Sequence, residues 1–173
     1  PNGFGITANA FRHFIKQAGL EKHIQEILRG LNARNVKELQ KRGREMRQCI
    51  LQAELPKDLQ EEIKKSYAKL GKTASVAVRS SATLEDLPGA SFAGQQETYL
   101  NVVGEEALLE ATKKTMASLF TDRAISYRKD KGFSSFGQLA VLVQEMVRAD
   151  KAASGVMFTI DPETGFDKVV LIN

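Results

Sequence analysis

The sequence has few of the residues that cross-link proteins or bind metals. Its 173 residues include one cysteine and two histidines. A single cysteine excludes an internal disulfide and is typical of a reducing compartment, so the expected location is the cytoplasm. His13 and His23 have no acid or thiol nearby at the spacing of a metal site or a catalytic triad. We therefore expect both histidines to be packing or surface residues.

Long apolar runs are also missing. No stretch approaches the roughly 20 apolar residues that a helix needs to span a bilayer, and no signal segment opens the chain. Hydrophobic residues make up 42% of the chain and charged residues 27%, which is typical of a globular protein with a packed core. We therefore expect a folded protein that has no membrane partner.

Charge is unevenly divided along the chain. Residues 1–72 hold 15 Lys and Arg against 8 Asp and Glu, a net charge of +7, whereas residues 73–173 carry −3. Basic segments can bind nucleic acid, but this one has no reader motif and few aromatic side chains for stacking. A solvated helical surface, with no nucleic-acid partner, is the favoured interpretation. The alternative is a docking surface for an acidic partner, formed by Lys41, Arg42, Arg44 and Arg47.

The first half of the chain has the spacing of helices. Apolar residues recur every three or four positions over 35–53 and 56–70, which predicts two amphipathic helices that form an antiparallel hairpin. The glycines of residues 1–5 predict a turn. Further helices are expected over 7–18, 21–29, 105–120 and 122–131.

The second half has the composition of strands. Apolar and β-branched runs predict strands over 75–78, 97–103, 139–143, 153–160 and 168–172. The run at 139–143 is continuously apolar, which predicts burial on both faces. Helices first and strands later indicate an α+β fold with a mixed or antiparallel sheet. A stretch rich in Gly and Ser near 131–138 predicts a helical, loop-bearing subdomain over 1–133 and a β-rich lobe that begins at 138.

The stretch from Val78 to Asn101 offers the clearest functional signal. Gly89 and Gly94 permit a close approach of the backbone, and a loop of small residues can turn several N–H groups toward one anion. Arg79, at the end of a strand, adds a charged planar fork suited to phosphate oxygens. The stretch thus has the chemistry of a loop that covers a polyphosphate. A long structural connection explains its composition equally well.

A polar interruption follows the apolar run at 139–143. Gln144 and Glu145 break the run before Met146 and Val147 resume it. A polar side chain and backbone groups therefore become available beside apolar walls, which suits a flat heterocycle. A strand that reaches solvent explains the same pattern.

Two adjacent carboxylates, Glu85 and Asp86, lie within the loop-like stretch. Such a pair can act as a metal or acid/base site. In a loop that contains proline, however, neighbouring acids more often serve as turn and capping groups. We favour the capping interpretation and predict no metal ligand in this chain.

Seven segments, spread over nearly the whole chain, carry a family resemblance. In this order they resemble the nucleotide-binding domain family of pyruvate, phosphate dikinase, and within it the phosphoenolpyruvate synthases. The segments are Pro1-Asn-Gly-Phe, Val78-Arg-Ser-Ser-Ala-Thr, Glu85-Asp-Leu-Pro, Ser91-Phe-Ala-Gly-Gln, Ser118-Leu-Phe-Thr-Asp-Arg-Ala, Val143-Gln-Glu-Met-Val and Ser154-Gly-Val-Met-Phe-Thr.

The resemblance implies an ATP-grasp-like site in an enzyme that converts ATP, pyruvate and water to AMP, phosphoenolpyruvate and phosphate through a phosphorylated histidine. It implies that Arg79 is catalytic and holds the ATP phosphates, that Gly94 brings backbone close to them, and that Thr98 lies at the end of the same loop. The adenine pocket would be lined by Gln144 and by the backbone of Glu145, Met146 and Val147.

The resemblance also implies parts that this sequence does not contain. The family's phosphate-binding lysine would precede Pro1, and the residues that hold Mg²⁺ would follow Asn173. The phosphorylated histidine and the pyruvate-binding barrel would belong to other domains of the same enzyme. A homodimer is the oligomeric state expected for the complete enzyme. This chain alone is therefore expected to be inactive. A related dikinase or an antibiotic phosphotransferase is the alternative within the family.

Overall fold

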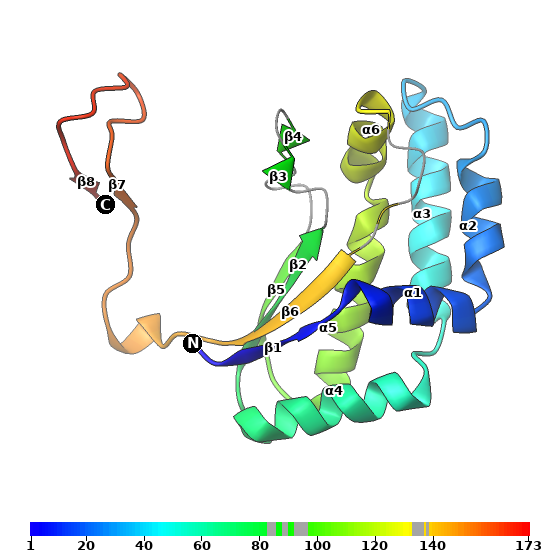
Figure 1. The fold of residues 1–173 in the computed structure, drawn as a ribbon, viewed down its shortest axis with the longest axis horizontal. Helices are drawn as coiled ribbons and strands as arrows, with labels where there is room; N and C mark the ends of the chain where they lie inside the picture. The colour runs from blue at the N-terminus through cyan, green and yellow to red at the C-terminus, as the bar shows by residue number, and fades with distance from the viewer. Residues whose placement is uncertain (83–85, 88–89, 92–96, 133–136, 138) are drawn as a thin grey trace.

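The computed structural model describes residues 1–82, 86–87, 90–91, 97–132, 137 and 139–173. Six α-helices and a four-stranded antiparallel sheet in these residues confirm the predicted α+β fold (Figure 1). The ATP-grasp-like arrangement stays a prediction. None of the helices in the described ranges combines the length and apolar character needed to cross a membrane.

The helices follow the predicted spacing closely. Thr7 and Asn35 cap two of them by accepting the N–H of the residue three positions ahead. Most helix ends fall within two residues of the expected positions. The helices are α1 (Ala8–Gln17), α2 (Leu20–Leu28), α3 (Val36–Gln52), α4 (Lys57–Leu70), α5 (Glu105–Ala117) and α6 (Asp122–Asp130), with a 3-10 turn, η1 (Ser118–Phe120), between the last two.

The expected antiparallel hairpin of α3 and α4 is wrong. Helix α3 packs against α5 and α6, whereas α4 runs across the bottom of the molecule toward α5 and the sheet (Figure 1). Ala53 ends α3 with an extended backbone, and Pro56 then starts a new direction. Lys113 of α5 fixes this bend because its amine donates to the carbonyls of Leu51 and Ala53, at 2.9 and 3.3 Å.

The sheet has the strand order β1-β6-β2-β5, with every neighbouring pair antiparallel. Its strands are β1 (Gly3–Ile6), β2 (Val76–Ala82), β5 (Thr98–Val102) and β6 (Leu139–Glu145). Strand β6 comes last in the sequence but lies between β1 and β2. A short hairpin of β3 (Asp86–Leu87) and β4 (Ala90–Ser91) stands apart from this sheet.

Strand β1 corrects the expected turn at residues 1–5. Glycine alternates here with larger residues, and the strand pairs with β6 from Gly3 opposite Gln144 to Ile6 opposite Val141. The two strands lie so close that a Cβ on Gly3 would sit 2.4 Å from the carbonyl oxygen of Val143. Glycine is needed at this position because of that approach, and it does not mark a turn.

The helices cover one face of the sheet (Figure 1). Val78, Val141 and Val143 point to the helices and are fully buried, whereas Leu142, between the last two, keeps 40% of its surface exposed. Strand β6 is therefore buried on one face, and the expected burial on both faces is wrong. In the described part of the chain, the helices that pack on the sheet all lie on the valine side.

Packing changes sharply after β6. No residue of 147–173 is buried, and this segment contains only the turn η2 (Ala149–Lys151) and a two-stranded hairpin, β7 (Met157–Phe158) and β8 (Leu171–Ile172). The expected strands at 153–160 and 168–172 shrink to these pairs. The two-lobe division stays a prediction, but the pairing of β6 places residues 139–145 in the first sheet.

Candidate functional site

The uncovered face of the sheet brings Arg79 and Thr98 together. Arg79 of β2 is the register partner of Thr98 in β5 and of Leu142 in β6. Residues directly opposite in an antiparallel sheet point to the same face, with Cβ atoms about 4.5–5.5 Å apart. Arg79 and Thr98 are both exposed. A guanidinium and a hydroxyl therefore lie side by side on the face against which no helix of the described residues packs.

Gln144 lies on the same face. It pairs with Ala77, two residues before Arg79, so it is a diagonal neighbour of the arginine at about 7–8 Å. Its partner on the other side is Gly3. Small residues on both flanks leave the amide of Gln144 accessible to a ligand that lies on the sheet.

The segment after β6 offers specific backbone groups. The N–H of Glu145 donates to the carbonyl of Asn2 at 2.8 Å, and the N–H of Met146 donates to the carbonyl of Ser75 at 2.9 Å. The N–H of Val147 has no acceptor among the described residues, and its side chain is 67% exposed. Val147 is thus the residue of this segment whose N–H is available to a ligand.

The structure places most of the predicted site residues along one line. Leu142, opposite Arg79, and Glu145, at the end of β6, are three residues apart, a separation of about 10 Å in an extended strand. Arg79, Thr98 and Gln144 share one face, and the segment up to Val147 continues from it. Gly94 lies outside the described residues.

Sequence reasoning missed the floor of this face. Register places Gly3 and Gly5 of β1, Ala77 of β2 and Ala140 of β6 on the same side as Arg79. These small residues make the face flat and open. The signal that could have revealed them is the alternation of Gly3 and Gly5 with Phe4 and Ile6, which has the period of a strand.

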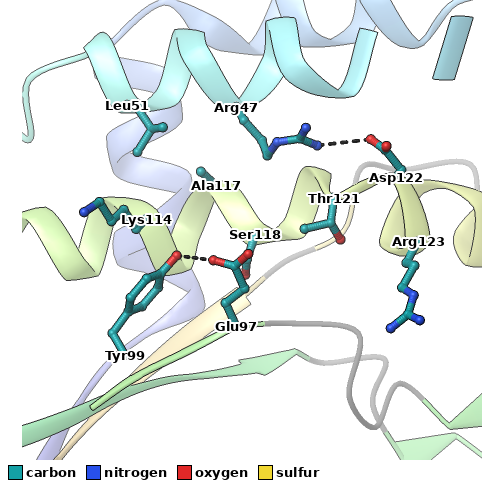
Figure 2. Close-up of a pocket in the computed structure, with 10 residues that line it drawn as sticks. All are labelled: Arg47, Leu51, Glu97, Tyr99, Lys114, Ala117, Ser118, Thr121, Asp122 and Arg123. Atoms are coloured by element: carbon teal, nitrogen blue, oxygen red, sulfur yellow. Dashed lines mark hydrogen bonds and ion pairs between the residues drawn. The ribbon is translucent and has the colours of Figure 1, made fainter. Parts of the chain in front are cut away.

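A separate cavity of about 330 Å³ lies on the helix side of β5, and none of the predicted site residues lines it (Figure 2). Two internal pairs occupy it. Arg47 donates to the carbonyl of Phe120 at 2.6 Å and to Asp122 at 3.2 Å, and the hydroxyl of Tyr99 donates to Glu97. Burial, and then Glu97, raise the pKa of Tyr99 above its ordinary value. Polar groups that line the cavity are therefore bonded to each other, as is usual where a helix layer meets a strand.

Two of the four cations of the predicted docking surface have structural roles. Arg42 donates to the carbonyls of Ile27 and Arg29 at 2.6 and 2.8 Å and pairs with Glu38 at 2.6 Å. Arg47 holds η1 and α6, as described above. Lys41 and Arg44 remain exposed. The basic patch available to a partner is therefore smaller than the sequence indicates.

No group of three or more His, Cys, Asp or Glu side chains among the described residues could hold a metal ion. These residues therefore do not fit a Mg²⁺ site by themselves.

Comparison with known proteins gives a consistent picture. Residues 1–173 match the family model described as pyruvate phosphate dikinase, AMP/ATP-binding domain. The chain is 56% identical over 179 residues to the phosphoenolpyruvate synthase of Aquifex aeolicus, 52% over 182 residues to that of Synechocystis sp., and 51% over 176 residues to that of Escherichia coli. These alignments cover 100%, 99% and 99% of the chain but 21%, 22% and 22% of the relatives. The chain thus spans about a fifth of their length.

Proposed function

Because the chain belongs to the pyruvate phosphate dikinase AMP/ATP-binding domain family, we propose that its open sheet face binds ATP as part of a phosphoenolpyruvate synthase. The observation that carries the proposal is the grouping of Arg79, Thr98 and Gln144 on one uncovered face. The complete enzyme would convert ATP, pyruvate and water to AMP, phosphoenolpyruvate and phosphate. This chain would supply one wall of its nucleotide site.

Arg79 would hold the phosphates. Its planar, positively charged guanidinium can donate two parallel hydrogen bonds to phosphate oxygens. It would keep the transferring phosphoryl group fixed and neutralise part of its charge, which is the main contribution that a protein makes to phosphoryl transfer. Thr98, directly opposite, would donate its hydroxyl to a neighbouring oxygen.

The end of β6 would hold the adenine. An adenine ring presents an acceptor nitrogen beside a donor amino group. The N–H of Val147 can supply the donor, since those of Glu145 and Met146 already bond within the protein, and a carbonyl of the same segment can accept from the amino group. The separation of about 10 Å between Leu142 and Glu145 lies within the length of an extended ATP molecule.

The rest of the reaction would depend on parts of the enzyme outside this chain. The family resemblance implies that Mg²⁺, pyruvate and the phosphorylated histidine would be bound there. The described residues offer no group of three side chains that could hold a metal ion. When present, the metal would neutralise phosphate charge beside Arg79. The cytoplasmic location rests on the single cysteine, and the homodimer rests on the family resemblance alone.

The decisive experiment removes the arginine from the complete enzyme. Arg79→Ala should weaken ATP binding about 10- to 150-fold, because a hydrogen bond to a charged group contributes about 1.5–3 kcal/mol. Arg79→Lys should recover part of the loss. Isothermal titration of ATP measures both effects. Arg44→Ala, which removes the same charge from the exposed surface of α3, serves as the control and should bind ATP normally. Unchanged ATP binding in Arg79→Ala would show that the proposed site is wrong.

A further inference from the structure

Arg128, in the last turn of α6, is buried without a hydrogen-bond acceptor. The residue is only 4% exposed. Its terminal nitrogens, Nη1 and Nη2, have no hydrogen-bond partner in the described structure. Burial without a partner is costly for a charged group, because its lost hydration is not replaced by hydrogen bonds. A native protein therefore retains such a group where an acceptor reaches it in some state.

The surroundings hold the guanidinium in place but do not satisfy it. Its central carbon lies 5.8 Å from the centre of the Phe120 ring. This cation–π contact attracts the charge but offers no acceptor to an N–H in the plane of the guanidinium. The stem packs beside Gly137, where an added Cβ would lie 3.7 Å from Cδ of Arg128. Burial lowers the pKa of Arg128 to about 10, so the group stays charged at neutral pH.

A position near a helix C-terminus does not explain this burial. A cation at this position is stabilised by the helix dipole while it stays at the surface, so it gains this without being buried. The next residue, Lys129, shows the ordinary arrangement, because it is exposed and its amine donates to the carbonyl of Leu31 at 2.7 Å. Arg128 instead points inward and lacks such an acceptor in the described part of the chain.

The location of Arg128 relates it to the functional end of the sheet. Gly137, which lies beside its stem, is two residues before β6, and Leu139, the first residue of β6, pairs with Ala82, the last residue of β2. Figure 1 shows α6 at the end of the molecule where β2 finishes and β6 begins. The buried cation thus lies near the end of the sheet where β2 finishes, three residues after Arg79.

We propose that Arg128 binds an oxyanion through two parallel N–H bonds from its terminal nitrogens, at the end of the sheet where β2 ends. The chemistry is that of a planar fork meeting two oxygens of one group. The oxyanion comes from a phosphate of the bound nucleotide or from a carboxylate elsewhere in the same polypeptide. The phosphate source rests on the proposed ATP site, and the carboxylate source does not.

The test uses the complete enzyme with Arg128→Met, which keeps the length of the side chain but removes its charge. Arg123→Met is the matched control, because Arg123 lies on the same helix and is exposed. Thermal unfolding of each variant is measured without ligand and with saturating ATP. Arg79→Ala, measured alongside, reports on the ATP site separately, so a failure of that site is recognised independently.

The two sources give different results. If a phosphate is bound, Arg128→Met keeps or raises the melting temperature without ligand, and the rise induced by ATP shrinks. If a carboxylate is bound, Arg128→Met lowers the melting temperature by several degrees in both conditions and leaves the ATP-induced rise unchanged.

One outcome overturns the proposal. If Arg128→Met behaves like Arg123→Met with and without ATP, no oxyanion is bound by this residue. Arg128→Lys keeps the test decisive if the methionine variant does not fold, because lysine keeps the charge but loses the fork. It should then show one of the two patterns at smaller amplitude, and wild-type behaviour in both conditions would equally overturn the proposal.

Discussion

The two faces of the four-stranded sheet come from alternate residues of the same strands, but they carry different side chains. Val78 points to the helices and is fully buried, whereas the next residue, Arg79, points away and is exposed. The covered face carries apolar side chains, among them the valines of β2 and β6, Ile6 and Leu139. The open face combines small residues with a few polar ones. One step along a strand therefore separates a residue that stabilises the fold from one that can bind a ligand.

The largest difference is expected between two leucines of β6. Leu139 is fully buried on the covered face, whereas Leu142 is 40% exposed on the open face. Leu139→Ala should lower the free energy of unfolding by about 2–5 kcal/mol, because it leaves a cavity in the core, and Leu142→Ala should cost about 1 kcal/mol or less. Urea unfolding of both variants measures this. Equal losses would show that the two faces are packed alike.

A smaller difference is expected between two glycines of β1. A Cβ on Gly3 would lie 2.4 Å from the carbonyl oxygen of Val143, but a Cβ on Gly5 would meet nothing within 4 Å. Gly3→Ala should therefore cost about 1–3 kcal/mol of stability, since β1 must move away from β6. Gly5→Ala should be neutral. If both variants were neutral, the close approach of these strands would not matter for stability.

Two threonine hydroxyls, one on the open face and one buried among the helices, are expected to differ by about 1 kcal/mol in their effect on ATP binding. Thr98→Val keeps the shape of a residue on the open face, and it should weaken ATP binding by about 0.5–1.5 kcal/mol with little effect on stability. Thr112→Val removes a buried hydroxyl of α5 that has no hydrogen-bond partner in the described structure. It should leave ATP binding unchanged and keep or raise stability. If Thr112→Val weakened ATP binding and Thr98→Val did not, the ligand would not bind on the open face.

The smallest effect concerns pH. Burial, followed by the contact with Glu97, raises the pKa of Tyr99 above its ordinary value of 10.0. The folded protein thus keeps this proton at a pH where the unfolded chain releases it, so stability present below pH 10 decreases as the pH rises above 10. Between pH 9 and pH 11 the wild type should lose more stability than Tyr99→Phe. Equal losses would show that Tyr99 is not protected from deprotonation.

Local patterns predicted the helices well. The helices begin close to the expected residues, and Thr7, Asn35 and Thr121 cap three of them. Capping and apolar spacing can be predicted because they are properties of neighbouring residues. The path of the chain between helices could not be predicted this way. The direction of α4 depends on contacts with α5, which is remote in the sequence.

The site was predicted in part. The placement of Arg79, Thr98 and Gln144 on one face depends on register, and the sequence gives no register for strands that lie far apart. The small residues of the open face could not be predicted in the same way, because the local pattern of Gly3 and Gly5 predicts a turn. The buried position of Arg128 could not be expected either, since an arginine in the last turn of a helix is ordinarily exposed.

The central position of β6 has a consequence for synthesis. Gly3 of β1 pairs with Gln144 of β6, about 140 residues later, so the first strand has no partner while most of the chain is being translated. At about 5–20 residues per second, this wait lasts on the order of ten seconds. A sheet closed by such a distant contact also folds slowly. The nascent helices, whose contacts are local, can form earlier and await the strand that completes the sheet.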